Sequence, residues 1–257
     1  MTLSTKTVWL LCAAALPLAP GYAIADDEIQ VYDGEVRAQG RSGVEIHMNW
    51  TPDGLQSASW PGQIPTRRAF NITPEISWGL GGGWDWGLYL PTTEASGAGW
   101  QSDGTKIRIK RIFSAEPGQP YWGANFELAR NRKTVAQQAW TGELRTIAGM
   151  VSGPWEVVGN LSLGFDLSGP ERKGSPELGV SARVVRKISD SWSLGAEHYA
   201  GCGPLNDLLT WQQSSQSSFG IVEYDSGSGW AIHMGIGHGW TDGAERTMFK
   251  SIVSIDF

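Results

Sequence analysis

The sequence predicts an all-β fold, a transmembrane antiparallel β-barrel of about 12 strands. The first observation is a series of short segments in which apolar and polar side chains alternate between turn residues, as they do in half-buried strands. The second is composition, because the 257 residues include 34 glycines and 14 tryptophans and show no convincing helical period. The third is the segment 249–257, which alternates and ends on Phe257, a pattern typical of a barrel strand.

Residues 1–25 are expected to be a secretory signal peptide. Lys6 precedes an apolar run over 8–18, and Ala23-Ile24-Ala25 fits a small-x-small cleavage site. The run is shorter than the roughly 20 residues of a membrane-spanning helix, which disfavours the alternative of a membrane anchor. Lys6 is the only charged side chain of this leader, so its removal makes the formal net charge of −6 more negative. Such acidity argues against nucleic acid as a partner.

Residues 26–42 form an N-terminal periplasmic segment or a plug. Ile29 and Val31 alternate with Gln30 and Tyr32, so the segment has three possible arrangements. It adds a strand to the barrel, enters the lumen as a plug, or remains a periplasmic tail.

The barrel itself is expected to span residues 43–257. Mean hydropathy is −0.24, and no later segment has the unbroken apolar run of a membrane helix. A chain of this kind crosses a membrane only as a closed barrel, because lipid offers no partner for an unpaired backbone group. The predicted strands are 43–52, 68–80, 84–93, 105–114, 121–130, 139–151, 155–168, 176–189, 192–201, 214–225, 230–240 and 246–257.

The connections between these strands alternate in length. Bacterial outer-membrane barrels have short periplasmic turns and longer outer loops, and with periplasmic termini every short connection falls on the periplasmic side. The one longer connection on that side is 114–120, which contains Pro117 and Pro120. The short connections are 81–83, 152–154, 190–191 and 226–229, and the long ones are 53–67, 94–104 and 202–213.

The tryptophans gather at strand ends. Trp230 and Trp240 lie ten residues apart on one face of one predicted strand, which is the spacing of two aromatic girdles around an apolar band. The core of a soluble sandwich would instead scatter its tryptophans toward the middle of strands. The predicted girdle residues are Trp50, Trp78, Trp84, Trp122, Trp140, Trp155, Trp192, Trp230, Trp240 and Phe257.

The opposite faces of the strands carry charge and are predicted to line the lumen, because charges are costly on the lipid face. Two interpretations of the basic row Lys106, Arg108 and Lys110 remain open. It forms a polarised constriction that selects small charged solutes, or it belongs to an ion-pair network that only stabilises the wall. The predicted lumen residues are Glu45, His47, Glu75, Asp85, Lys106, Arg108, Lys110, Glu127, Glu143, Arg145, Glu156, Asn160, Asp166, Arg183, Lys187, Glu197, His233, Arg246 and Lys250.

Metal and redox chemistry are not indicated. Once Cys12 leaves with the leader, Cys202 is the one cysteine left, so neither an intrachain disulfide nor a thiolate metal pattern can form. His47 and His233 are isolated in sequence and are weak evidence for a metal site. We therefore expect no metal and no cofactor.

Several stretches resemble a family of uncharacterised proteobacterial outer-membrane barrels, often described as transporters and similar to the phenol-degradation outer-membrane proteins. The resemblance implies location in the bacterial outer membrane, passive transport, and a lumen that includes Glu143, Arg145, Asn160, Glu197 and Tyr199. The chain departs from the family pattern at Thr146, Leu161 and His238. The stretches are 26–32, 121–128, 142–147, 159–160, 194–201 and 237–241.

An outer-membrane lipid hydrolase is an alternative of a different class. His198 and His238 are expected toward the outer side and, by parity, on the lipid face, with Ser217, Ser218 and Asp242 as possible neighbours. Catalysis would need serine and histidine at hydrogen-bond distance and a third group that orients the base. The two histidines lie on strands separated by another, and the motifs of such enzymes are absent, so no catalytic residue is assigned.

The sequence therefore favours a narrow passive channel or transporter for small polar or charged solutes. A non-conducting structural or adhesion barrel and a lipid hydrolase are the alternatives. The expected partners are outer-membrane lipids and lipopolysaccharide, the barrel-assembly machinery through the C-terminal strand, and a solute that the sequence does not identify.

Overall fold

A computed structural model of the chain describes residues 28–95, 97, 99–113, 118–170 and 172–257. It is an all-β structure in which twelve strands close into an antiparallel barrel, as predicted. No helix in the described ranges is long and apolar enough to cross a membrane. The predicted signal peptide, residues 1–25, lies outside the described residues.

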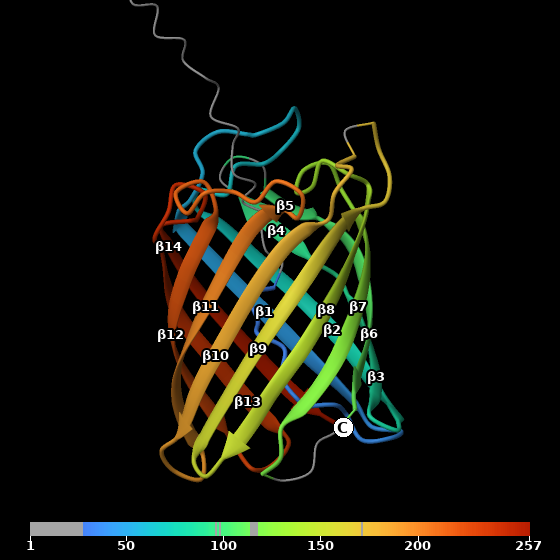
Figure 1. The fold of residues 1–257 in the computed structure, drawn as a ribbon, viewed down its shortest axis with the longest axis vertical. Coiled ribbons are helices and arrows are strands. Elements are labelled where there is room, and N and C mark those ends of the chain that lie inside the picture. The colour runs from blue at the N-terminus through green and yellow to red at the C-terminus, as the bar shows by residue number, and fades with distance from the viewer. Residues whose placement is uncertain (1–27, 96, 98, 114–117, 171) are drawn as a thin grey trace, which may run out of the picture.

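Fourteen strands form one sheet within the described ranges (Figure 1). Most of their bounds lie within two residues of the predicted ones. The strands are β1 (Ser42–Asp53), β2 (Ala69–Gly81), β3 (Trp84–Tyr89), β4 (Thr92–Ala95), β5 (Gly99–Ser102), β6 (Gly104–Ile112), β7 (Tyr121–Asn131), β8 (Trp140–Ser152), β9 (Trp155–Asp166), β10 (Glu177–Lys187), β11 (Trp192–Pro204), β12 (Ser215–Asp225), β13 (Trp230–Gly239) and β14 (Thr247–Asp256).

Pairing between the first and last strands closes the barrel. β1 pairs with β14 from Gly43 opposite Asp256 to Trp50 opposite Phe249, and pairs with β2 on its other side. The C-terminus lies at the end that carries the short turns, whereas the longer connections lie at the opposite end (Figure 1). A tight turn joins β2 to β3 through Gly81, Gly82 and Gly83, whose φ angles of 82°, 61° and 78° are adopted readily only by glycine.

The predicted strand 84–93 is interrupted. β3 ends at Tyr89, and after Leu90 and Pro91 the chain continues as β4, which no longer pairs with β6 but with β5 and the upper part of β2. Proline has no N–H for the ladder, so a break at Pro91 is physically expected. The resulting β4–β5 hairpin lies within the connection predicted as a loop, which corrects that prediction.

The outward face of the wall is apolar and carries paired aromatic side chains. At the C-terminal end of the barrel, Trp78 stacks on Trp86 at 4.7 Å between ring centroids, and Phe113 stacks on Trp122 at 4.1 Å. Between the two ends, side chains such as Ile236 are largely exposed, with 63% of the Ile236 surface accessible. An apolar belt bounded by aromatic residues is the exterior of a membrane barrel.

Residues 28–41 run inside the barrel. Val31 and Tyr32 pack against inward-facing Ile112, Tyr121, Ile147 and Val158. Ile29 packs on the other side of the lumen in a cluster with Val185, Phe219, Ile221 and Met248. Near the C-terminal end, the backbone of Gln39 forms an isolated parallel bridge with Gly79 of β2. Of the three arrangements open for this segment, the structure shows one within the lumen.

Arginine in place of Ile236 tests the membrane-facing surface. We expect Ile236→Arg to reduce the free energy of folding into lipid vesicles by about 2–4 kcal/mol, because the side chain would lie in hydrocarbon. Leu208→Arg is the control, since Leu208 is also exposed (55%) but lies in the connection between β11 and β12. Urea titrations of both variants measure the difference. Equal stabilities of the two variants would contradict an exterior embedded in lipid.

Candidate functional site

The lumen gathers the charged side chains of the chain, and the basic row on β6 lies at its centre. Arg108 contacts Glu75 at 2.7 Å and Asp85 more closely still, and also donates to the Tyr89 hydroxyl at 2.8 Å. Lys110 lies 3.9 Å from Asp85. All of these side chains are buried. Buried charges are expensive unless paired, and here the row is paired along its length.

Lys106, at the end of the same row, joins the wall to the inner segment. Its ammonium lies 2.9 Å from Glu28 and 3.4 Å from Glu127. The Tyr32 hydroxyl lies within 2.8 Å of the same two carboxylates, at 2.6 Å from Glu28 and 2.8 Å from Glu127. The basic row is therefore neutralised in part by the inner segment and in part by the wall.

A second charged group lies on the far wall. Arg183 contacts Asp33 at 2.8 Å, Glu223 at 2.8 Å and Glu156 at 3.2 Å. Three carboxylates on one guanidinium leave this region with an excess of negative charge. Asp33 belongs to the inner segment, so this group also ties that segment to the wall.

Lys250 of β14 is a further cation of this wall. It pairs with Glu197 and donates to the backbone carbonyl of Ile29 at 3.0 Å. Its side chain has no solvent-exposed surface. The Tyr199 hydroxyl donates to Glu197 at 2.8 Å, which adds a hydrogen bond to the same carboxylate.

The backbone of the inner segment is held by side chains of the wall instead of by a neighbouring strand. Asn160 accepts from the Tyr32 N–H at 2.8 Å and donates to the Tyr32 carbonyl at 2.8 Å. Arg145 lies 3.4 Å from the carbonyl of Gln30. One amide side chain thus reproduces both hydrogen bonds that a strand would make to this residue.

The middle of the lumen is filled. Tyr89 is fully buried, Val31 is 1% exposed and Tyr32 is 3% exposed. At this level these three side chains leave almost no surface to solvent. The inner segment, rather than the wall alone, blocks the lumen.

A vestibule opens below this level, at the end of the barrel with the short turns. Its volume is about 940 Å³, and it is lined by the inner segment and by most of the wall. Among the described residues, eleven carboxylate side chains line it against six from lysine and arginine. The vestibule is therefore acidic.

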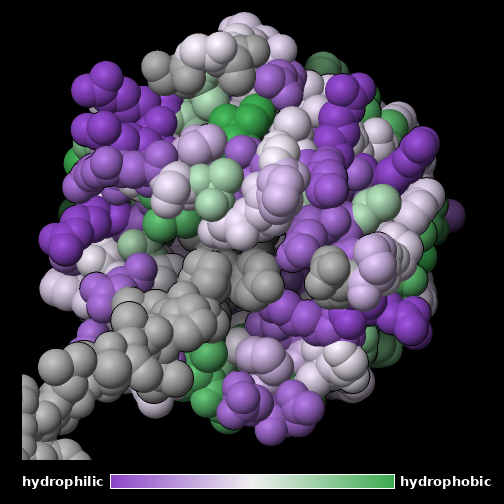
Figure 2. All heavy atoms as spheres, turned by 90° about the horizontal axis from the view of Figure 1, so that it is seen from above, coloured by the Kyte–Doolittle hydropathy of each residue, from purple (hydrophilic) through white to green (hydrophobic). Residues whose placement is uncertain are grey.

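A separate hollow of about 410 Å³ lies at the opposite end, between the connection after β1 and the one before β14. Figure 2 shows this end, where hydrophilic side chains predominate. Asp53, His238 and Glu245 line the hollow. Burial raises the pKa of Glu245, against the opposing effect of the hydrogen bond that Thr66 donates to it.

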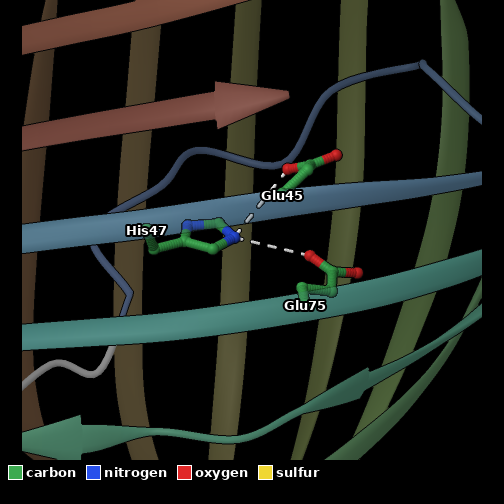
Figure 3. A group of neighbouring side chains, drawn as sticks. All are labelled: Glu45, His47 and Glu75. Carbon is green, nitrogen blue, oxygen red and sulfur yellow. Dashed lines mark hydrogen bonds and ion pairs between the residues drawn. The ribbon is translucent and has the colours of Figure 1, made fainter. Parts of the chain in front are cut away.

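Three side chains of the charged lumen have the donor set of a metal site. Glu45 and His47 come from β1 and Glu75 from β2, and all three point toward one another inside the barrel (Figure 3). No metal was expected from the sequence, because His47 is isolated there. The missing signal is the strand register, which places Glu45 directly opposite Glu75.

The structure places nearly all of the predicted lumen residues on the inward face of the wall. Arg246 is the exception, because it lies in the connection before β14 and is exposed at the rim of the outer hollow. Parity is a guide only while the strand continues, and β14 begins at Thr247.

Sequence reasoning missed inward-facing Tyr89, Tyr121 and Phe219. Tyr89 shares the parity of Asp85 on β3, and Tyr121 that of Glu127 on β7. Phe219 lies on β12, for which no lumen residue was predicted.

The predicted girdle residues lie on the outward face. Trp50 stacks on Phe249 at 5.3 Å, and Trp192 and Trp230 flank Tyr224. Trp86 was not included among them, although its alternation with Asp85 indicates the same face as Trp78 and Trp84.

The histidines considered for catalysis are divided between two strands. His198 of β11 lies outward with Nδ1 at 2.9 Å from Ser218 Oγ and Nε2 at 3.1 Å from Gln216 Oε1. His238 of β13 instead packs edge-on against Trp240. Ser217 is buried and Asp242 exposed, and neither joins the pair. The group that orients His198 is therefore the neutral amide of Gln216.

No family model matches the chain, and no curated protein matches it. Solved structures with the same fold include an outer membrane channel from Pseudomonas putida F1, with a TM-score of 0.60 and 10% identity, over 90% of this chain and 100% of that one. The KdgM porin has a TM-score of 0.58 and 11% identity, over 84% of this chain and 99% of that one. The NanC porin has a TM-score of 0.53 and 9% identity, over 83% and 98%.

These similarities establish the fold, which is that of bacterial outer-membrane barrels, and the apolar exterior agrees with that location. The predicted resemblance to outer-membrane barrels is confirmed at this level. The narrower similarity to the phenol-degradation proteins stays a prediction.

Asn160→Ala tests how the inner segment is held. We expect the Tyr32 amide to exchange its hydrogen about tenfold faster or more, because two hydrogen bonds of about 1 kcal/mol each are lost. Asn71→Ala is the matched control, since Asn71 is a buried lumen asparagine whose partner, Thr93, belongs to the wall. Hydrogen exchange read by mass spectrometry measures both. Unchanged protection of Tyr32 in Asn160→Ala would contradict the described contact.

Proposed function

We propose that the protein is a passive outer-membrane channel for small polar or charged solutes, closed in this conformation by residues 28–41. The observation that carries the proposal is a lumen lined by charged side chains and blocked by a segment that is not part of the wall. The fold similarity to an outer membrane channel and to two porins supports the same class.

The inner segment is held by contacts that water and ions can replace. Three of its charged groups, Glu28, Asp33 and Arg37, each pair with a wall residue of opposite charge. Its apolar contacts involve only a few side chains, chiefly Ile29, Val31 and Tyr32. The wall closes on itself without this segment, so its departure would leave a barrel with a polar lumen.

The acidic vestibule favours cations among small solutes. Eleven carboxylates against six basic side chains raise the local concentration of cations through the field that they produce. The KdgM porin, by contrast, was solved with oligogalacturonate, an acidic oligosaccharide. The charge of the vestibule argues against that class of solute for this chain.

Conductance with and without the inner segment tests the proposal. We expect the mature protein to be silent or to open rarely in a planar bilayer, and deletion of residues 26–36 to give steady conductance. Under a potassium chloride gradient, the reversal potential should indicate preference for potassium over chloride.

The control for this deletion is its migration on gels, where a shift between boiled and unboiled samples shows that the barrel has folded. A folded deletion variant that stays electrically silent would contradict the channel and favour the structural or adhesion barrel. A preference for chloride would contradict the assigned charge selectivity alone.

Lipid hydrolysis is the second candidate, favoured by one observation. His198 contacts Ser218 on the outward face, where its other nitrogen meets Gln216, so a serine and an oriented base are in place. Release of fatty acid from phospholipid vesicles, lost in Ser218→Ala, would support this function. Absence of release by the folded wild-type protein would exclude it.

A further inference from the structure

The register of β1 and β2 places two carboxylates directly opposite each other in the lumen. Glu45 is the cross-strand partner of Glu75, and both face inward. Like charges in this position destabilise a sheet. An arginine contacts each carboxylate from outside the pair, and the side chain that lies between the two is His47.

The separations around His47 are long for hydrogen bonds. Its Nε2 lies 3.4 Å from Glu75 Oε2 and 3.8 Å from Glu45 Oε2, whereas N–H···O bonds are normally about 2.7–3.2 Å. Ligands at about 2.1 Å from a tetrahedral zinc ion lie about 3.4 Å from one another. His47 Nε2 is thus spaced from Glu75 as one metal ligand is from another, and all three ligand atoms lie within 4.8 Å of one another. A small contraction is required at Glu45.

The other oxygens of both carboxylates are already held. Arg37 contacts Glu45 Oε1 at 3.0 Å, and Arg108 contacts Glu75 Oε1 at 2.7 Å. Each arginine fixes one oxygen and leaves the second directed at His47 (Figure 3). Outer partners that orient carboxylate ligands in this way are usual at metal sites.

The His47 side chain presents one nitrogen to both carboxylates. It is 1% exposed, and Nε2 is the ring atom that faces Glu45 and Glu75. A neutral imidazole nitrogen is a common metal ligand.

Charge and access are also suitable for a cation. Glu45 and Glu75 line the acidic vestibule, which connects the cluster to the periplasmic end of the barrel. A dication arriving from this side would meet a site with two carboxylates already in place.

We propose that Glu45, His47 and Glu75 bind one divalent transition-metal ion of the zinc type, which reaches them from the vestibule. One imidazole nitrogen and two carboxylate oxygens suit zinc and similar ions better than calcium, which prefers oxygen ligands alone. The ion would balance the opposed carboxylates and join β1 to β2. This inference is independent of whether the barrel conducts.

Isothermal titration of the refolded mature protein with zinc chloride tests the site. We expect one zinc ion per chain. His47→Gln should lower the zinc affinity about 100-fold, because removal of a residue that only orients a ligand already lowers metal affinity by about 10–100-fold. Substitution with cobalt(II) should give the visible absorption of a tetrahedral ion in the wild type and not in the variant.

His233→Gln is the matched control. His233 also lies between two carboxylates, but they face different ring nitrogens, with Nδ1 at 3.0 Å from Glu223 and Nε2 at 3.6 Å from Glu197. The three groups therefore do not converge on one ion as they do at His47. We expect its zinc affinity to equal that of the wild type.

Three outcomes would overturn the proposal: no zinc bound by the wild type, equal affinity in His47→Gln, or an equal loss in His233→Gln. Heat-modifiable migration shows that each variant has folded. If His47→Gln does not fold, Glu45→Gln provides the same test, with the same expected loss.

Discussion

Lipid hydrocarbon offers no hydrogen-bond partner to the backbone, so every N–H and C=O of the wall has to be paired within the protein. The pairing of β1 with β14 completes this requirement, since it removes the two edges that the sheet would otherwise have. Antiparallel closure then determines the rest of the wall. Alternate side chains face lipid and lumen, so the same ladder produces the apolar exterior and gathers the charged residues inside.

The inner segment faces a related requirement, and apart from the bridge between Gln39 and Gly79 its described residues pair with no strand. Its backbone lies at membrane depth, and wall side chains take the place of a neighbouring strand. Asn160 binds both the backbone N–H and the backbone carbonyl of Tyr32, and Lys250 binds the backbone carbonyl of Ile29. Because the wall supplies these partners, the segment fills the lumen without becoming part of the barrel. The stability of the wall therefore does not depend on whether the segment fills the lumen.

Alternation alone predicted the strands and their faces because each strand is read locally, with a period of two. The exterior pattern of Trp230, Met234, Ile236 and Trp240 is of this kind. Contacts between distant residues could not be predicted in the same way. The bond between Tyr32 and Asn160 spans 128 positions, and nothing in either stretch indicates its partner. The break at Pro91 was visible in the sequence, but the change of partner from β6 to β5 depends on the completed sheet.

The central claim is that residues 28–41 occupy the lumen of a closed barrel, and cysteine accessibility at position 31 tests it most directly. In a Cys202→Ser background, Val31→Cys should resist a water-soluble maleimide while the protein is folded in vesicles and react fully after boiling. Leu208→Cys, in an exposed connection, should react in both states. Labelling of Val31→Cys in the folded protein as fast as Leu208→Cys would contradict the account.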